Sequence, residues 1–202
     1  MTDLNKEFGE IDIYLFDQLL RKRITPGMRI LDAGCGFGRN LVYLLREGFE
    51  VFGVDSDPRA VNATRRLAAS IAPTLPADNF RLETVEAMSF PDAFADVVIS
   101  SAVLHFATGD ANFRAMLEGT WRVLKPGGLL FCRLASSIGI ENQLQQVTGR
   151  RLHLPDGSER YLVDAPLLLQ LTANLGGHLV DPLKTTVVHD QRSMTTWVVR
   201  KA

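Results

Sequence analysis

The residues best suited to chemistry form a glycine-rich run near the beginning of the chain. Gly34, Gly36 and Gly38 alternate directly behind the apolar segment 29–32, which ends in Asp32. Glycine lacks a side chain, so it adopts unusual backbone dihedrals and lets a ligand approach the backbone closely. The run therefore predicts a ligand-binding loop to which Asp32 adds a fixed negative charge.

The charge and spacing of this loop discriminate between two kinds of ligand. A dinucleotide loop delivers a pyrophosphate to a helix N-terminus and has the spacing G-x-G-x-x-G. Here Arg39 occupies the last glycine position, and the Asp32 carboxylate would repel a pyrophosphate but attract the cationic groups of a methionine sulfonium. Asp55 follows Gly38 by 17 residues, where an acid can accept hydrogen bonds from both ribose hydroxyls. The pattern favours a cationic, ribose-bearing ligand.

Hydrophobic periodicity predicts alternating strands and helices that would position this loop. An N-terminal helix within 1–25 comes first, and two β-rich runs, 179–188 and 195–200, close the chain as an antiparallel pair. Such alternation implies an α/β fold with a mostly parallel sheet, in which ligands bind beyond the carboxyl ends of the strands. Between the termini we expect strands at 29–32, 50–55, 80–84, 96–100 and 129–135, and helices at 40–47, 57–71, 112–124 and 164–175.

Length and composition predict one domain over residues 1–202. The chain is 46% hydrophobic and 22% charged, and its formal net charge of -1 gives no global attraction to nucleic acid or an anionic membrane. Segment 136–161 loses the alternation, so we interpret it as an insertion and a candidate substrate lid. The polar N-terminus, the apolar stretch 97–107 that is too short for a bilayer and the use of only two cysteines predict a cytoplasmic protein without membrane segments.

Four parts of the sequence together resemble the class I S-adenosylmethionine-dependent methyltransferases: 30–40, Asp55, 96–100 and 124–128. The resemblance implies a Rossmann-like, seven-stranded sheet with helices on both faces and a C-terminal antiparallel hairpin. It also implies S-adenosyl-L-methionine as the cofactor and S-adenosyl-L-homocysteine as the product. The glycine loop would then meet the methionine part, Asp55 the ribose, and the end of the fourth strand the sulfonium. The implied contacts are Asp32, Gly34, Cys35, Gly36, Asp55, Ser56, Ser100 and Ser101.

The third strand departs from the family pattern, which commonly has an acid beside the adenine. This chain has Thr84 there, followed by Val85 and Glu86. Thr84 could accept a hydrogen bond from the adenine amino group while the Val85 N–H donates one, and Glu86 is the rival contact. Both assignments stay open at the level of sequence.

Three residues are candidates for the methyl-acceptor side. His105 follows the fourth strand, where it could remove a proton from a phenol or amine or simply anchor the next helix. Tyr14 could cover the pocket or pack against the sheet. Arg133 places a charge within an apolar strand, so it must either pair with a carboxylate, which we favour, or face an anionic substrate.

The sequence thus predicts methyl transfer from a sulfonium to a nucleophilic atom of a small molecule, mainly by positioning. The short single-domain form resembles small-molecule methyltransferases, including the tellurite-resistance type. No zinc-ligand spacing is present, and the near-neutral charge disfavours a nucleic-acid acceptor. The alternatives are an NAD-dependent oxidoreductase of similar fold and a noncatalytic protein that binds an adenosine ligand.

Overall fold

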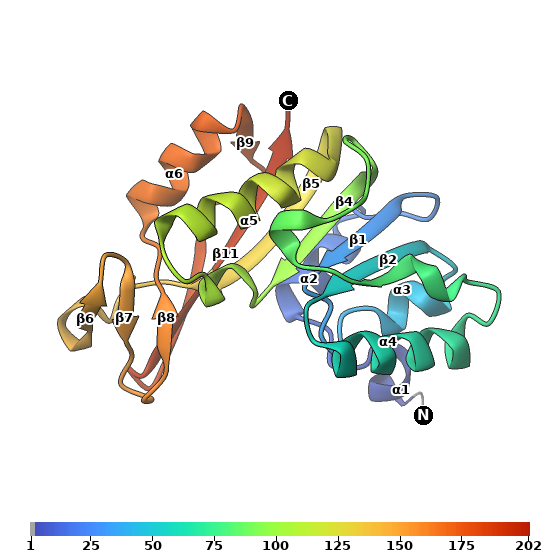
Figure 1. Ribbon diagram of the computed structural model, residues 1–202, viewed down its shortest axis with the longest axis horizontal. Coiled ribbons are helices and arrows are strands. Elements are labelled where there is room, and N and C mark those ends of the chain that lie inside the picture. Colours follow the sequence, from blue (N-terminus) through green and yellow to red (C-terminus); the bar gives the residue numbers. More distant parts are fainter. Residues whose placement is uncertain (1–2) are drawn as a thin grey trace.

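The computed structural model describes residues 3–202, which form an α/β fold around one large sheet (Figure 1). The strand order is β10-β11-β5-β4-β1-β2-β3, with β9 also paired to β11. Pairing is parallel from β3 to β5, whereas β11 runs antiparallel to β5, β9 and β10. The strands are β1 (Arg29–Ala33), β2 (Glu50–Asp55), β3 (Phe80–Leu82), β4 (Ala95–Ser101), β5 (Leu124–Ala135), β9 (Gly177–Leu179), β10 (Lys184–Val188) and β11 (Arg192–Lys201).

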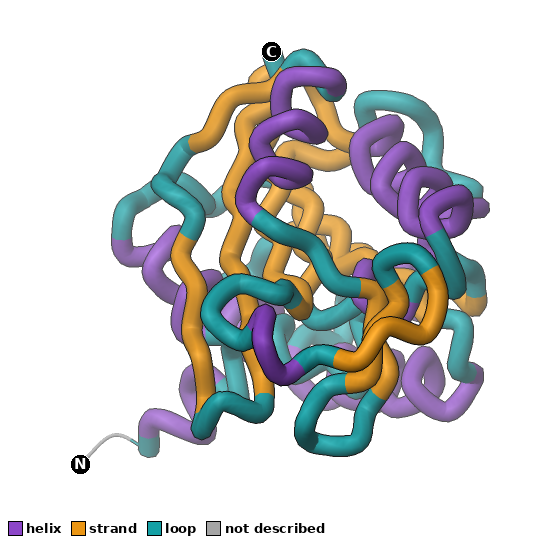
Figure 2. Tube along the Cα trace, turned by 90° about the vertical axis from the view of Figure 1, so that its left-hand side faces the viewer, coloured by secondary structure: helices purple, strands orange, loops and turns teal. Residues whose placement is uncertain are grey.

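Helices cover both faces of this sheet, as predicted (Figure 2). Alternate residues of β1 enter different cores: Ile30 packs with the first group of helices and Leu31 with the second. This division follows from the strand geometry, because successive side chains point to opposite faces. The first group contains α2 (Ile13–Leu20), α3 (Val42–Arg46) and α4 (Pro58–Ile71), and the second contains α5 (Asp110–Val123) and α6 (Ala165–Asn174).

The predicted strand 179–188 is divided in the structure. β9 pairs with the last residues of β11 and β10 with the first, so both occupy the same edge of β11. The break contains Pro182, which has no N–H to donate to a β-ladder, and Asp181, whose side chain turns away to Gln18 and Arg23. The sheet therefore has seven strand positions, one of them filled by two short strands.

The prediction of one N-terminal helix is wrong. Two helices are present, α1 (Leu4–Phe8) and α2, while residues 1–2 of the predicted range lie outside the described residues. Gly9 ends α1 with a φ of 61°, a conformation that glycine adopts without the steric penalty of a side chain. Asp12 then caps α2, its carboxylate accepting a hydrogen bond from the Tyr14 N–H at 3.0 Å. A single apolar repeat therefore spans two helices.

Segment 136–161 contains more regular structure than the sequence indicated. It holds a three-stranded antiparallel sheet of β6 (Gln145–Thr148), β7 (Arg151–His153) and β8 (Glu159–Tyr161). This small sheet lies at the lower left of Figure 1 and packs on the end of β5 through a core of Ala135, Leu154 and Leu162. Tyr161 at the end of β8 also contacts α5, and its hydroxyl donates to Asp110 at 2.9 Å. Among residues 3–202, no helix combines the length and the apolar character needed to cross a bilayer.

Candidate functional site

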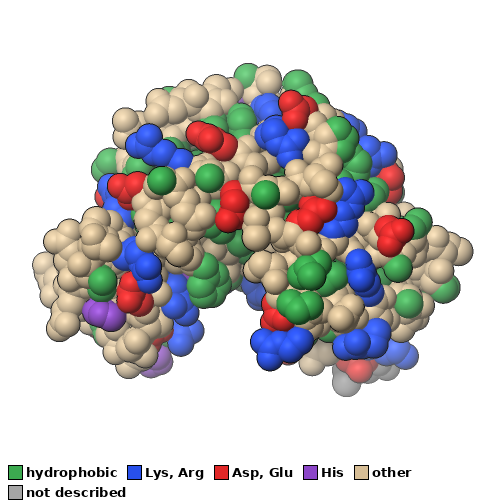
Figure 3. Space-filling view, viewed as in Figure 1, with side chains coloured by type: hydrophobic (Ala, Val, Ile, Leu, Met, Phe, Trp, Pro, Cys, Tyr) green, Lys and Arg blue, Asp and Glu red, His purple; other side chains and the backbone are tan. Residues whose placement is uncertain are grey.

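A cleft of about 640 Å³ opens at the carboxyl ends of β1, β2 and β4. The surface in Figure 3 is hollowed between the lobe that carries β6 to β8 and the lobe that carries α1 and α4. Five predicted residues do not line the cleft: Tyr14, Asp32, Ser100, His105 and Arg133. The predicted residues that do line it are Gly34, Cys35, Gly36, Asp55, Ser56, Thr84, Val85, Glu86 and Ser101.

The glycine loop is held rigidly at the floor of the cleft. The N–H groups of Gly34 and Cys35 both donate to the Val54 carbonyl at 2.9 Å, and the Gly36 N–H donates to Asp55 Oδ2 at 2.8 Å. A Cβ on Gly34 would lie 2.4 Å from a methyl carbon of Val103, so that glycine allows close packing. A Cβ on Gly36 would meet nothing within 4 Å, and its φ is 52°. Gly36 therefore leaves the floor open to a ligand.

Asp55 is oriented by the backbone at the end of β2. One carboxylate oxygen accepts from the Gly36 N–H, and the other accepts from the Asp57 N–H at 2.9 Å. A carboxylate oxygen can accept two hydrogen bonds, so each oxygen retains an acceptor site toward the cleft. This geometry suits the recognition of a vicinal diol.

The next part of the lining comes from the segment after β3. That strand ends at Leu82, and the short 3-10 helix Val85–Ala87 follows it. Thr84 and Glu86 both line the cleft, and Glu86 accepts a hydrogen bond from the Asn112 amide at 3.4 Å. Because both side chains reach the cleft, the two alternatives for the adenine contact remain open.

Asp32 is buried at the end of β1, beneath the glycine loop. Its exposed fraction is 1%, and neither carboxylate oxygen has a hydrogen-bond partner among residues 3–202. Burial raises the pKa of Asp32 to about 8, Arg39 opposes the increase, and the charge of Asp55 adds to it. An unpartnered buried carboxyl group is rare in a folded protein and points to a donor or cation supplied by a ligand.

His105 packs against the end of β5 rather than along the cleft. Its Nδ1 accepts a hydrogen bond from the Ala135 N–H at 3.1 Å, so the proton of the neutral ring is on Nε2. Burial, together with the nearby Arg160 and Arg133, lowers the pKa of His105 to about 4. At neutral pH the imidazole is therefore a hydrogen-bond donor without a free lone pair.

Arg133 pairs with a carboxylate, and that carboxylate is Asp12. The ion pair joins Arg133 Nη1 and Asp12 Oδ2 at 3.2 Å, and the Tyr14 ring lies 5.7 Å from the guanidinium. The same oxygen accepts a hydrogen bond from the Ser101 hydroxyl at 3.3 Å and lies 4.0 Å from Arg39 Nη2. Asp12 thus joins α2, β4 and β5, and the sequence analysis did not predict this role. An aspartate directly before a helical apolar repeat is a signal of a helix cap that could have drawn attention to it.

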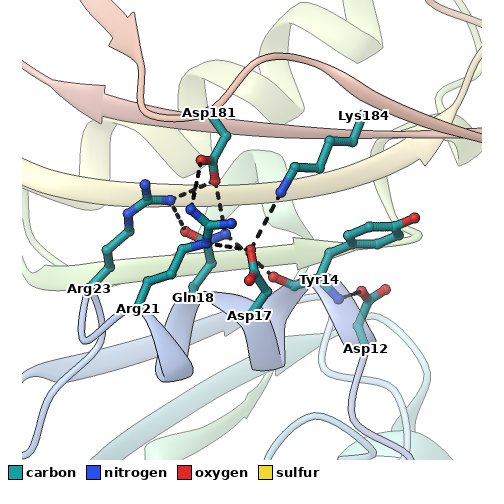
Figure 4. A network of polar contacts seen from close by, with 8 residues as sticks. All are labelled: Asp12, Tyr14, Asp17, Gln18, Arg21, Arg23, Asp181 and Lys184. Carbon is teal, nitrogen blue, oxygen red and sulfur yellow. Dashed lines mark hydrogen bonds and ion pairs between the residues drawn. The ribbon is translucent and has the colours of Figure 1, made fainter.

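Polar contacts fix α2 against the C-terminal strands (Figure 4). Asp181 accepts hydrogen bonds from Gln18 at 3.1 Å and Arg23 at 2.6 Å, and Lys184 lies 3.4 Å from Asp17. Tyr14 shares a hydrogen bond of 2.8 Å with the Thr186 hydroxyl. Because these contacts anchor the helix along its length, they also hold its capping residue beside the cleft.

The strand order and the loop after β1 define a Rossmann-like fold of the kind found in methyltransferases. A family model described as a methyltransferase domain matches residues 31–132, which are half of the chain. The chain therefore belongs to this methyltransferase domain family. The match disfavours the alternative of an NAD-dependent oxidoreductase.

Curated relatives match about half of the chain. A ubiquinone biosynthesis O-methyltransferase of Methylocella silvestris is 35% identical over 117 residues, covering 56% of this chain and 43% of the relative. An uncharacterized methyltransferase of Synechocystis is 33% identical over 106 residues, covering 52% of this chain and 46% of the relative. The matched part thus spans less than half the length of these relatives.

Solved structures share the fold over nearly the whole chain. The 1,6-didemethyltoxoflavin-N1-methyltransferase of Burkholderia thailandensis, solved with its substrate and S-adenosylhomocysteine, has a TM-score of 0.71 at 20% identity. That match covers 96% of this chain and 80% of the other. The magnesium protoporphyrin IX methyltransferase of Synechocystis, solved with bound SAH, has a TM-score of 0.72 at 18% identity and covers 94% and 81%. The predicted Rossmann-like fold is confirmed.

Proposed function

We propose that the chain binds S-adenosylmethionine and transfers its methyl group to a nucleophilic atom of a small-molecule acceptor. The observation that carries this proposal is the buried, unpartnered Asp32 beneath the glycine loop. A ligand with an ammonium and a sulfonium group provides the positive charge that this carboxyl group lacks. The family match and the bound S-adenosylhomocysteine of the Burkholderia structure support the same cofactor.

The remaining donor set fits the rest of this cofactor. Asp55 has acceptor sites for two ribose hydroxyls, and Gly36 leaves room for the amino-acid part. Thr84 and Val85, or Glu86, would contact the adenine, and Ser56, Ser100 and Ser101 are proposed as further contacts. When bound, S-adenosylmethionine supplies an activated methyl group with a neutral thioether as leaving group.

The chain itself contributes mainly by positioning the reactants and by excluding water. The cleft orients an acceptor toward the loop and removes water from around the reacting atoms. Because Nδ1 of His105 is occupied and the ring does not line the cleft, we propose that this residue anchors the turn after β4 against β5 instead of taking a proton from the acceptor. Segment 136–161 is proposed as the lid, supported by its position directly after β5.

A small-molecule acceptor is supported by the relatives, whose names specify ubiquinone biosynthesis and 1,6-didemethyltoxoflavin. A nucleic-acid acceptor is disfavoured by the formal net charge of -1. The tellurite-resistance type and a cytoplasmic location remain predictions from sequence.

Calorimetry with S-adenosylhomocysteine and with NADH tests the cofactor. We expect binding of the first and none of the second. Asp55→Asn should weaken binding by about 10-fold to 100-fold, because a charged hydrogen-bond acceptor is lost. The matched control is Asp78→Asn, an exposed aspartate in the short 3-10 helix Ala77–Asn79, which should change the affinity less than about 2-fold. Binding of NADH alone, or equal effects of the two variants, would refute the proposal.

Catalysis needs a separate measurement. Transfer of a labelled methyl group to a panel of thiols, phenols, amines and carboxylates distinguishes an enzyme from a protein that only binds the cofactor. Cofactor binding without transfer to any member would favour the noncatalytic alternative.

A further inference from the structure

Two arginine side chains gather around one buried carboxylate beside the cleft. Arg39 and Arg133 lie 4.0 and 3.2 Å from the same carboxylate oxygen of Asp12. Arg133 thus shares its carboxylate partner with a second arginine. An arginine whose counterion is shared in this way can still attract an anion.

Arg133 has unused hydrogen-bonding capacity in this cluster. Its Nε is buried and has no hydrogen-bond partner among residues 3–202, although Nη1 contacts Asp12. A buried donor without a partner is costly, so a ligand that supplies an acceptor would be favoured. Planar carboxylates match the fork of an arginine side chain.

Arg160, which lies in β8 of the small sheet, adds a further cationic group to Arg39 and Arg133. Within residues 3–202 no carboxylate lies within 4.0 Å of Arg160, and its Nη1 donates to the neighbouring Glu159 carbonyl at 2.7 Å. Its guanidinium lies 4.8 Å from the centre of the Phe106 ring. Phe106 directly follows His105 in the chain. The His105 ring accepts a hydrogen bond from the Ala135 N–H, and Ala135 lies two residues after Arg133 in β5. Arg133 and Arg160 therefore flank the same turn, and both lower the pKa of His105.

Two aromatic rings stand exposed in the same cleft. The exposed fractions of Phe37 and Phe106 are 67% and 60%, and both residues line the cleft. Large exposed aromatic side chains that converge with a few polar groups are typical of a small-molecule site. The rings offer an apolar surface in the cleft, and the Phe106 ring lies next to Arg160.

We propose that the methyl acceptor is an aromatic carboxylic acid, its carboxylate bound by Arg133 and Arg160 and its apolar body against Phe37 and Phe106. This inference rests on the proposed methyltransferase function and specifies its acceptor. Asp12 is a positioning residue, because it holds Arg133 beside the cleft without itself contacting the carboxylate.

The test uses the whole chain saturated with S-adenosylhomocysteine and three probes: 2-naphthoate, 2-naphthamide and acetate. Calorimetry or ligand-observed NMR measures the affinity of each. We expect 2-naphthoate to bind at least about 10-fold more tightly than its uncharged amide, the change typical of one charge-assisted hydrogen bond. Acetate, which lacks the aromatic body, should bind at least as weakly as the amide. Equal affinities of naphthoate and naphthamide, or equal affinities of naphthoate and acetate, would overturn the proposal.

Variants locate the carboxylate. Arg160→Gln should abolish the preference for naphthoate, and it removes no ion pair within residues 3–202. Arg133→Gln removes the shorter of the two ion pairs of Asp12. The double variant Asp12→Asn, Arg133→Gln keeps the net charge of the cluster unchanged and should also lose the preference. The matched control is Arg150→Gln, which removes a cation of the same inserted segment that pairs with Asp164. It should retain the preference. A preference that survives in the Arg160 and the double variants overturns the assignment.

The cofactor measurement separates the two proposals. If the wild-type chain fails to bind S-adenosylhomocysteine, the proposed function fails. If it binds S-adenosylhomocysteine but shows no preference for the carboxylate, only the assignment of the acceptor fails.

Discussion

Asp32→Asn should change how the stability of the protein depends on pH. In the native state burial raises the pKa of Asp32 to about 8, whereas an unfolded aspartate has a pKa near about 3.9. Between these values the unfolded state has released this proton and the native state has kept it. The native state therefore binds more protons, and its stability relative to the unfolded state falls as the pH rises.

The magnitude follows from the slope of about 1.4 kcal/mol per pH unit for one proton. Between pH 5.5 and 7.5, Asp32 should reduce the free energy of unfolding by about 2.5 kcal/mol. His105 acts in the opposite direction below pH 6.5, because its pKa is lowered to about 4 and the unfolded state binds the extra proton. The effect of Asp32 is therefore read from the difference in unfolding free energy between the wild type and Asp32→Asn. The contribution of His105 is the same in both proteins and cancels in this difference.

Urea unfolding at pH 5.5, 6.5 and 7.5 without ligand measures this difference. Asp32→Asn should gain stability over the wild type as the pH rises, by about 2.5 kcal/mol over the range. Calorimetry adds an independent readout: if S-adenosylhomocysteine prefers the ionised carboxylate, its affinity for the wild type should increase toward pH 8, and the affinity of Asp32→Asn should be weak and flat. Parallel stability profiles of the two proteins would refute the reasoning.

Three further changes test other parts of the site. Gly36→Ala should weaken binding of S-adenosylhomocysteine by at least about 10-fold, because its Cβ would extend into the cleft. Calorimetry measures this affinity. The control for backbone strain is Gly48→Ala, because Gly48 also has a positive φ and a Cβ there would meet nothing within 4 Å. His105→Gln should reduce the loss of stability between pH 6.5 and 4.5 in urea unfolding and change the affinity for S-adenosylhomocysteine less than about 3-fold. Asp12→Ala should destabilise the protein by about 3–5 kcal/mol, because the Arg133 charge loses its partner. A double-mutant cycle with Arg133→Met, measured by urea unfolding, should show strong coupling between the two changes. Additive effects of the two changes would contradict this explanation.

The sequence predicted the elements whose signals are local. Strand 50–55 has the predicted bounds, and the Asp57-Pro58 pair starts α4 as expected. Both depend on neighbouring residues alone: an apolar run for the strand, a capping carboxylate and a proline for the helix. The glycine loop is of the same kind, because its glycines and Asp32 are adjacent; its contact with a cofactor stays a prediction.

The sequence did not predict features that depend on distant partners. It indicated that Arg133 needs a counterion, but Asp12 lies 121 residues away and is brought near only by the packing of α2 on the sheet. The strands of 136–161 are three or four residues long, too short for an alternating pattern to be visible. The engagement of His105 by a backbone N–H likewise depends on tertiary structure.

The chemistry of the cleft favours holding an acceptor over removing its proton. Within the described residues its lining contains neither histidine nor lysine. Of its carboxylates, Asp55 and Glu86 lie on the side assigned to the cofactor, and Glu10 is exposed in the N-terminal segment. His105 has no free lone pair, and burial raises the pKa of the Cys35 thiol well above its usual value. A carboxylate oxygen that receives the methyl group is already anionic at neutral pH, so the new O–C bond forms without release of a proton and without a base. A carboxylic acid therefore agrees with the two arginine side chains and with this set of lining residues. For such an acceptor the rate should follow the ionisation of the acceptor itself, and the protein would act through position and charge.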